Sequence, residues 1–264
     1  MTQRCDILVG TSGYSYRDWV GPVYPEGTRQ SEYLRLYTQM FPVVELNFSF
    51  YRQPEPAMLD RMLKTSEGKL GFAVKAFREL THEVSPKRFE AVADTFRAGI
   101  RPLEAADKLE SVLLQFPYSF HYTPPNREYL AKLADRMAGL PLAVEFRNSG
   151  WFHERVFEGL RQFKIALVSV DEPKLPKLPP PVAEVTAPLG YVRMHGRNAE
   201  KWWDGDNQTR YDYTYSDDEL REWLPRIASI AEQASQLLVF FNNHWRGQAA
   251  ENAKRLMELI NEEL

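Results

Sequence analysis

The sequence has little cysteine and no long apolar run. Cys5 is the only cysteine, which excludes a disulfide within the chain and favours a reducing, cytoplasmic location. No stretch approaches the roughly 18–20 apolar residues that span a bilayer, so we expect no membrane partner. The first apolar run is very short before glycine, threonine and serine follow, so we expect no secretion signal.

An excess of one charge is also missing. The 33 Lys and Arg residues nearly balance the 36 Asp and Glu residues, and the net charge is −3. Such a balance gives no global attraction to nucleic acid or to an acidic membrane, so a nucleic-acid partner would need a local basic patch. With 44% hydrophobic residues, the chain can form a substantial core. No linker divides it, and we predict a single domain over residues 1–264.

Eight short apolar runs recur along the chain. They span residues 6–11, 43–47, 71–75, 111–116, 142–146, 165–170, 191–195 and 237–243. Near-continuous apolar strands indicate a sheet buried on both faces, which is usually a parallel sheet covered by helices. Segments with helical spacing separate most of the runs, and the helices that we predict span 31–40, 57–68, 88–109 with a break near Pro102, 126–139, 154–163, 217–233 and 248–264.

This alternation predicts a TIM-like (β/α)₈ barrel rather than an open doubly wound sheet. One segment departs from the pattern. Residues 171–190, between strands six and seven, contain six of the 18 prolines. Because proline lacks the N–H that a helix interior needs, we expect this segment to lack a regular helix.

Polar side chains end every predicted strand. Side chains two residues apart share one face of a strand, so Glu145 and Arg147 share a face, as do Arg193 and His195. Barrel enzymes carry their catalytic groups at the carboxyl ends of the strands, and desolvating so many polar groups without a ligand is costly. The sequence therefore predicts a ligand site at this rim, with a structural network of ion pairs as the alternative.

The loops that follow the strands are rich in aromatic residues. Tyr14 lies in the first loop, and Trp202 and Trp203 lie in the seventh, residues 196–216. That loop is too long for a simple connection, which indicates a lid or a binding loop. Aromatic faces beside Arg and Lys suit stacking on a sugar or a nucleobase, and packing of the loops on one another is the alternative.

Several segments closely resemble the YecE-like family, a family defined as a domain of unknown function. They read VGTSGYSYRDWVGPVYP, VELNFSFYRQP, FAVKAFRELTHE, LLQFP, AVEFR, YVRMHGR and FFNNHWRGQAAENAKRL, and they extend from about residue 7 to 260. The resemblance implies a TIM-like barrel and no established activity. One departure is FRNSGW, where Asn148 stands at a position that is more often histidine in the family.

The favoured function is that of a metal-independent hydrolase or lyase without a cofactor, acting on a small polar, sugar-like or phosphorylated ligand. Glu145 is the expected base or nucleophile and His195 the proton donor. Glu45 is the second carboxylate, and Lys75 is expected to pair with it. The expected ligand-binding residues are Asn47, Gln115, Arg147, Asp171, Arg193, Asn242, Tyr14, Trp202 and Trp203.

Other functions stay open. A divalent metal site would use Glu145, Asp171 and His195, completed by Glu45 or His244. A nucleotide or single-stranded nucleic acid would be bound by basic residues interleaved with aromatics, namely Arg197, Lys201, Arg210 and Arg246. Lys75 as a Schiff-base lysine would need a depressed pKa, which its acidic neighbours are expected to oppose. His195 is alternatively a barrel histidine whose hydrogen bonds are all made within the protein.

Overall fold

The protein is a closed barrel of eight parallel strands in a computed structural model, which describes residues 5–264 except the side chains of residues 207 and 208. Each strand pairs with the next one along the chain, and the last pairs with the first. The predicted TIM-like (β/α)₈ barrel is therefore confirmed. The strands are β1 (Asp6–Ser12), β2 (Val43–Leu46), β3 (Gly71–Lys75), β4 (Leu109–Gln115), β5 (Leu142–Glu145), β6 (Ala166–Asp171), β7 (Leu189–Met194) and β8 (Gln236–Phe241).

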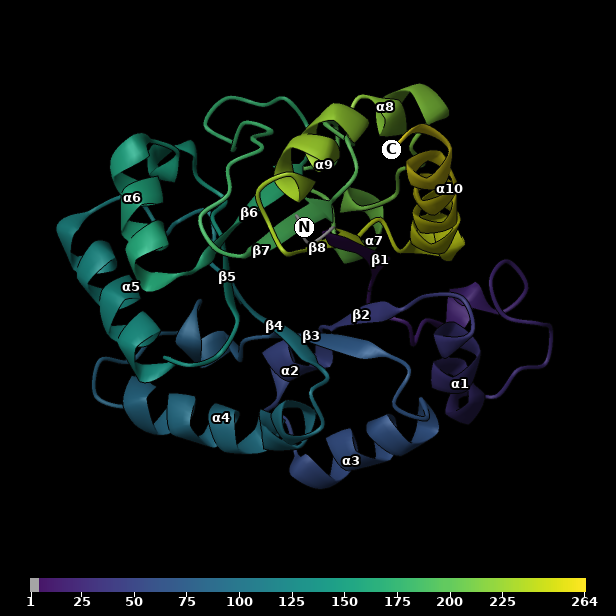
Figure 1. Cartoon of the computed structure of the whole chain (residues 1–264), viewed down its shortest axis with the longest axis horizontal. Helices are drawn as coiled ribbons and strands as arrows, with labels where there is room; N and C mark the ends of the chain where they lie inside the picture. The colour runs from purple at the N-terminus through teal and green to yellow at the C-terminus, as the bar shows by residue number, and fades with distance from the viewer. Residues whose placement is uncertain (1–4) are drawn as a thin grey trace.

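Helices surround the barrel (Figure 1). In that view α3 and α4 lie along the bottom, α5 and α6 on the left, and α8, α9 and α10 at the top and upper right. No helix of the described residues is both long enough and apolar enough to cross a membrane. The helices are α1 (Tyr33–Thr38), α2 (Phe48–Tyr51), α3 (Pro56–Thr65), α4 (Phe89–Ala105), α5 (Pro124–Arg136), α6 (Glu154–Phe163), α7 (Asn207–Arg210), α8 (Asp217–Arg221), α9 (Leu224–Ala231) and α10 (Gln248–Glu263).

Prolines affect two of the predicted helices and one connection between strands. α4 continues through Pro102 instead of breaking there, because the proline lies in the last turn and removes only one late backbone hydrogen bond. The helix predicted over 217–233 is divided, and Pro225 lies in the first turn of α9, where a missing N–H has no cost. Residues 172–188, all of which the structure describes, contain no helix.

The barrel interior is filled by alternate residues of the strands. Val43, Ala73, Ala143, Val168 and Tyr191 belong to one buried cluster inside the barrel, while the intervening residues pack against the helices. Extending this alternation to the carboxyl ends of the strands gives the inward side chains at the mouth. These are Glu45, Lys75, Gln115, Glu145, Glu172, Arg193 and Asn242.

Close packing at the seam between β1 and β2 requires a glycine. A methyl group on Gly10 would lie 2.1 Å from the carbonyl oxygen of Val43, which is far inside van der Waals contact. Gly10 therefore lets β1 and β2 approach each other, and it begins the three-residue register that these strands share.

Candidate functional site

Arg193, on β7, lies at the centre of a charged cluster at the mouth of the barrel and is almost fully buried. Its Nη1 donates to Glu145 Oε2 and its Nη2 donates to Glu45 Oε1, each at 2.6 Å. The hydroxyl of Tyr191 donates to the other oxygen of Glu45 at 2.7 Å. One guanidinium group thus fills the space between two buried carboxylates, and a glycosidic bond cannot lie between them as glycosidase chemistry requires.

Glu145 has further basic partners. Arg147 pairs with its Oε1 through Nε, and Nε2 of His195 lies 3.3 Å from the same oxygen. Burial alone would raise the pKa of Glu145, but Arg147, Arg193 and His195 together lower it well below its ordinary value. Glu145 is therefore a carboxylate committed to ion pairs, and its side chain has no exposed surface.

His195 does not have the properties of the predicted proton donor. Burial, followed by the charge of Arg147, lowers its pKa to about 3, so the ring is neutral near neutral pH. Nδ1 lies 3.1 Å from Nδ2 of Asn242, and Nε2 faces Glu145. Nδ1 thus has a hydrogen-bond partner, while Nε2 is in close contact with Glu145 but makes no hydrogen bond to a described residue, so the alternative of a barrel histidine held within the protein is supported at one nitrogen.

Asp171 faces outward, away from the mouth, and this corrects its predicted place in the site. Its carboxylate accepts hydrogen bonds from Trp223 Nε1 at 2.6 Å, from the Tyr215 hydroxyl at 2.7 Å and from Arg197 Nη2 at 2.8 Å. Asp171 therefore holds the seventh loop against α8 and α9. The reason is alternation, because Val168 and Val170 of the same strand face the interior.

Glu172 occupies the inward position that was predicted for Asp171. Its Oε2 accepts a hydrogen bond from Arg147 Nη1 at 3.2 Å. Burial raises the pKa of Glu172 to about 8 despite Arg147, so this carboxyl group is mostly protonated at neutral pH. The charge of Arg147 is thus offset by one carboxylate, Glu145, rather than by two.

A cavity of about 630 Å³ lies above this cluster. Its charged lining residues are Arg52, Lys75, Arg147 and Arg193, and no Asp or Glu is among the described residues that line it. Asn47, Gln115 and Asn242 add amide groups, and Tyr14, Tyr16, Phe48, Phe50, Tyr51 and Tyr211 add aromatic rings. The cavity therefore presents cations, amides and aromatic faces to a ligand, while the carboxylates lie behind the arginines.

Four buried polar atoms of the lining residues have no hydrogen-bond partner in the part of the chain that the structure describes. They are Oδ1 of Asn47, Nε of Arg193, Nδ1 of His244 and Nε of Arg147, the last of which still pairs with Glu145 by charge. Burial lowers the pKa of His244 to about 4, so this ring is also neutral. Buried polar atoms are usually paired, and their location in the cavity wall suits a ligand that supplies the missing hydrogen bonds.

The predicted site residues divide into two groups. Tyr14, Asn47, Lys75, Gln115, Arg147, Arg193 and Asn242 line the cavity, whereas Glu45, Glu145, His195, Asp171, Trp202 and Trp203 do not. Trp202 is buried, and the guanidinium carbon of Arg147 lies over its indole ring, 5.7 Å from the ring centroid. Trp203 is half exposed and contacts Tyr118 edge to face. Trp202 therefore orients Arg147, and neither tryptophan is placed to stack on a ligand in this cavity.

Sequence reasoning missed three residues at the mouth. Glu172 was detectable from the alternation of β6, because Val168 and Val170 precede it on the same face. Arg52 and Tyr211 lie in loops that line the cavity, and loops carry no periodic signal that would point to single residues. The aromatic content of those loops was the available clue.

Lys75 differs most from its predicted role. It lines the cavity, and no ion pair joins it to any Asp or Glu of the described residues, so the expected pair with Glu45 is absent. Burial and the nearby Arg193 lower its pKa to about 7, although Glu145 and Glu45 act in the opposite direction. Burial thus outweighs the acidic neighbours that were expected to keep the pKa of Lys75 high, and those carboxylates are already paired with Arg193.

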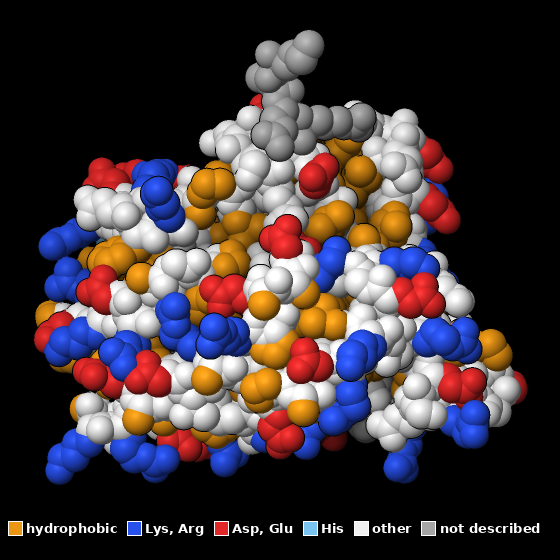
Figure 2. Space-filling view, turned by 60° about the horizontal axis from the view of Figure 1, so that its bottom comes forward, with side chains coloured by type: hydrophobic (Ala, Val, Ile, Leu, Met, Phe, Trp, Pro, Cys, Tyr) orange, Lys and Arg blue, Asp and Glu red, His pale blue; other side chains and the backbone are white. Residues whose placement is uncertain are grey.

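The alternative functions find less support in the geometry. The carboxylate of Asp171 points away from the mouth, toward Tyr215 and Trp223, so the predicted metal shell does not assemble. The described residues contain no group of three or more Asp, Glu, His or Cys that could hold a metal ion. Arg197 is paired with Asp171. Basic and acidic side chains are interspersed on the face that Figure 2 shows, without a patch of one sign.

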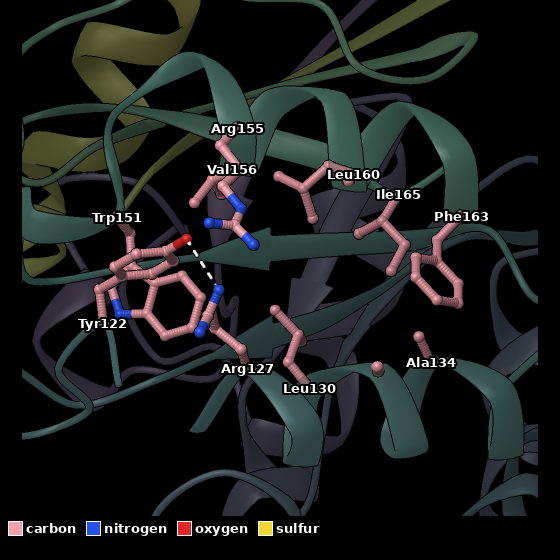
Figure 3. Close-up of a pocket in the computed structure, with 12 residues that line it drawn as sticks. Tyr122, Arg127, Leu130, Ala134, Trp151, Arg155, Val156, Leu160, Phe163 and Ile165 are labelled. Carbon is pink, nitrogen blue, oxygen red and sulfur yellow. Dashed lines mark hydrogen bonds between the residues drawn. The ribbon is translucent and has the colours of Figure 1, made fainter. Parts of the chain in front are cut away.

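A second, smaller hollow of about 200 Å³ lies between α5 and α6, outside the barrel (Figure 3). Its lining is mostly apolar, and at one end Arg127 donates to the hydroxyl of Tyr122 at 3.4 Å. None of the predicted site residues lines it. The cavity at the barrel mouth is therefore the candidate functional site.

Comparisons with known proteins agree with the fold. The family described as "Protein of unknown function DUF72" matches residues 8–264. The "UPF0759 protein YunF" of Bacillus subtilis (strain 168) is 32% identical over 269 residues, which cover 96% of this chain and 94% of that protein. A crystal structure of a DUF72 family protein from Thermotoga maritima MSB8 is 38% identical with a TM-score of 0.90, covering 97% of this chain and 99% of that one. Another, from Enterococcus faecalis V583, is 26% identical with a TM-score of 0.85, covering 98% and 99%. The chain belongs to the DUF72 family.

Proposed function

We propose that the mouth of the barrel binds a small anionic ligand, such as a phosphorylated or carboxylated sugar-like molecule, and acts on it by metal-independent lyase-type chemistry. The observation that carries this proposal is the sign of the lining. Every charged side chain among the described lining residues is a cation, and charge-assisted hydrogen bonds from guanidinium groups suit phosphate and carboxylate.

The arrangement assigns different roles to the charged residues. Glu45 and Glu145 hold Arg193, and Glu145 also holds Arg147, so the carboxylates orient the cations instead of reacting themselves. The guanidinium of Arg52 contacts the ring of Phe48 and the sulfur of Met58 and pairs with no Asp or Glu of the described residues, which leaves its charge available at the edge of the cavity. Lys75 is an ionisable group inside the cavity whose pKa is lowered to about 7, and groups with perturbed pKa values concentrate at functional sites.

Two broader proposals accompany this one. The single cysteine supports a cytoplasmic location. The segments that resemble the YecE-like family lie within the matched residues 8–264, so we take YecE-like and DUF72 to describe one family.

A thermal-shift titration tests the proposed function. Glucose 6-phosphate and inorganic phosphate should stabilise the protein, by about 2.7 kcal/mol at one hundred times the dissociation constant, and added salt should weaken the effect. Glucose should stabilise it far less. Arg52→Gln should weaken binding of the anion without disturbing the buried cluster. Arg101→Gln, on the outer surface of α4, should leave binding of the anion unchanged. Equal stabilisation by glucose and its phosphate, or an unchanged response of Arg52→Gln, would refute the proposal.

A further inference from the structure

Lys75 is fixed in place at the carboxyl end of β3. Its strand lies between β2 and β4, with Lys75 itself aligned with Leu113 of β4, and its carbonyl oxygen accepts a hydrogen bond from the hydroxyl of Ser49 at 2.6 Å. Its Nζ lies 4.4 Å from the ring centroid of Phe50. The amine is therefore presented to the cavity from a rigid strand with an aromatic ring beside it.

The two carboxylates that strand alternation places at the mouth with Lys75, Glu45 and Glu145, do not neutralise it. Glu45 accepts from Arg193 and Tyr191, and Glu145 pairs with Arg193 and Arg147. A contact with an aromatic ring stabilises a cation by only about 0.5–2 kcal/mol, which is a weak substitute for a carboxylate in a desolvated place. The structure thus contains a lysine inside a ligand-sized cavity without a charged partner among the described residues.

The charges around Lys75 come from four neighbouring segments. The pKa of Lys75 is shifted by Glu45 on β2, by Glu145 and Arg147 at the end of β5, and by Arg193 on β7. The charge of Lys75 in turn lowers the pKa of His82, which follows β3. Burial lowers the pKa of His82 to about 4, so that ring adds no positive charge near neutral pH. With its pKa of about 7, Lys75 has a large neutral fraction at pH 7, as a nucleophilic amine requires.

We propose that Lys75 is a nucleophile that forms an imine with the aldehyde or ketone group of an anionic substrate, whose anion is bound by Arg147 and Arg52. This inference rests on the proposed function and names its substrate class. The neutral amine adds to the carbonyl carbon to give a carbinolamine. Loss of water then completes the C=N bond, with the oxygen coming from the carbonyl and the two hydrogens from the amine. No oxidant or reductant is needed. A proton taken up from solvent then converts the neutral imine to the cationic imine, which withdraws electrons from the adjacent carbon, as lyase chemistry requires.

Pyridoxal 5′-phosphate is a suitable probe because it combines an aldehyde, a phosphate and an aromatic ring. The protein is incubated with the probe, reduced with sodium borohydride and mapped by peptide mass spectrometry. At pH 7 the modification of Lys75 should exceed that of Lys254, an exposed lysine on α10, by about tenfold or more, because an ordinary lysine with a pKa near 10.4 is almost entirely protonated. The rate at Lys75 should rise to half its maximum near pH 7, and inorganic phosphate should compete.

Two further arms separate the possible results. Lys75→Arg keeps the positive charge and should retain stabilisation by phosphate while losing the label. Pyridoxal without its phosphate should label Lys75 more slowly than the phosphorylated probe. If phosphate stabilises the protein and yet Lys75 is labelled no faster than Lys254, the imine proposal is overturned and the proposed function stands. If both probes label Lys75 equally and phosphate does not compete, the anionic substrate class and the proposed function are overturned together.

Discussion

Replacing Arg193 with methionine should destabilise the protein more than any other single change at the barrel mouth. The substitution removes the hydrogen bonds to Glu145 and Glu45. Glu45 then keeps only the Tyr191 hydroxyl, and Glu145 keeps Arg147 and His195. Removing one partner of a buried ion pair typically costs about 3–5 kcal/mol, which is a large part of the roughly 5–15 kcal/mol by which domains are stable.

Urea unfolding at several pH values measures this loss. In the native protein the pKa of Glu145 is lowered, so this group contributes stability above its unfolded pKa and loses the contribution as pH falls through the folded pKa. Without Arg193, one cause of the lowered pKa of Glu145 is lost and this carboxylate protonates more easily. The difference in unfolding free energy between the native protein and Arg193→Met should therefore be largest near pH 7 and should narrow as pH falls toward 4.

Two additional variants keep the prediction falsifiable. Arg193→Met combined with Glu45→Gln should recover about 0.5–3 kcal/mol relative to Arg193→Met alone, because the second change removes one unpaired charge. Arg136→Met, which breaks the exposed pair between α5 and Asp94 of α4, should have little effect. Equal losses for Arg193→Met and Arg136→Met, or a pH-independent difference, would show that the buried cluster does not stabilise the barrel as described.

Three other predictions follow from the same structure. Asp171→Asn should lower the unfolding free energy by on the order of 2 kcal/mol and should speed amide hydrogen exchange in residues 196–216, because that loop loses its carboxylate acceptor; unchanged exchange would contradict this role. Gly10→Ala should destabilise the protein by about 1–3 kcal/mol or more, because the added methyl group overlaps the carbonyl oxygen of Val43. Gly159→Ala in α6 should instead stabilise it by about 0.5–1 kcal/mol, because its added methyl group meets no atom within 4 Å. Thermal unfolding of the two variants tests this difference. Lys75→Met should raise Tm more at pH 6 than at pH 9, because a lysine with a lowered folded pKa opposes folding most fully below that pKa and less as pH rises above it; a larger gain at pH 9 would contradict the lowered pKa.

Much of the barrel could be predicted from local sequence patterns. The apolar run at 71–75 coincides with β3, and the segment at 154–163 coincides with α6. The errors are at prolines, where the sequence does not say whether a proline falls in the last turn of a helix, like Pro102, or at the first turn of a new one, like Pro225. That distinction depends on the packing of the helix against the neighbouring strand, which determines where the helix ends.

The candidate site was predictable in its location and only partly in its chemistry. Alternation placed Glu45, Glu145 and Arg193 in one cluster, and their hydrogen bonds agree. The acid predicted on β6 was wrong because Asp171 was chosen, although alternation from the inward Val168 and Val170 places Glu172 at the mouth. Which carboxylate each cation contacts depends on three-dimensional competition, so the sequence could not show that Arg193 would leave Lys75 without an acidic partner.

Closure of the barrel depends on the two strands that lie farthest apart in the chain. β1 and β8 align six consecutive residue pairs, so β1 presents an unpaired edge until β8 arrives. During synthesis β8 leaves the ribosome almost a whole chain length after β1, and open strand edges invite association with other chains. We expect nascent chains that stop before β8 to be the forms that need a chaperone, because only the last strand completes the ring.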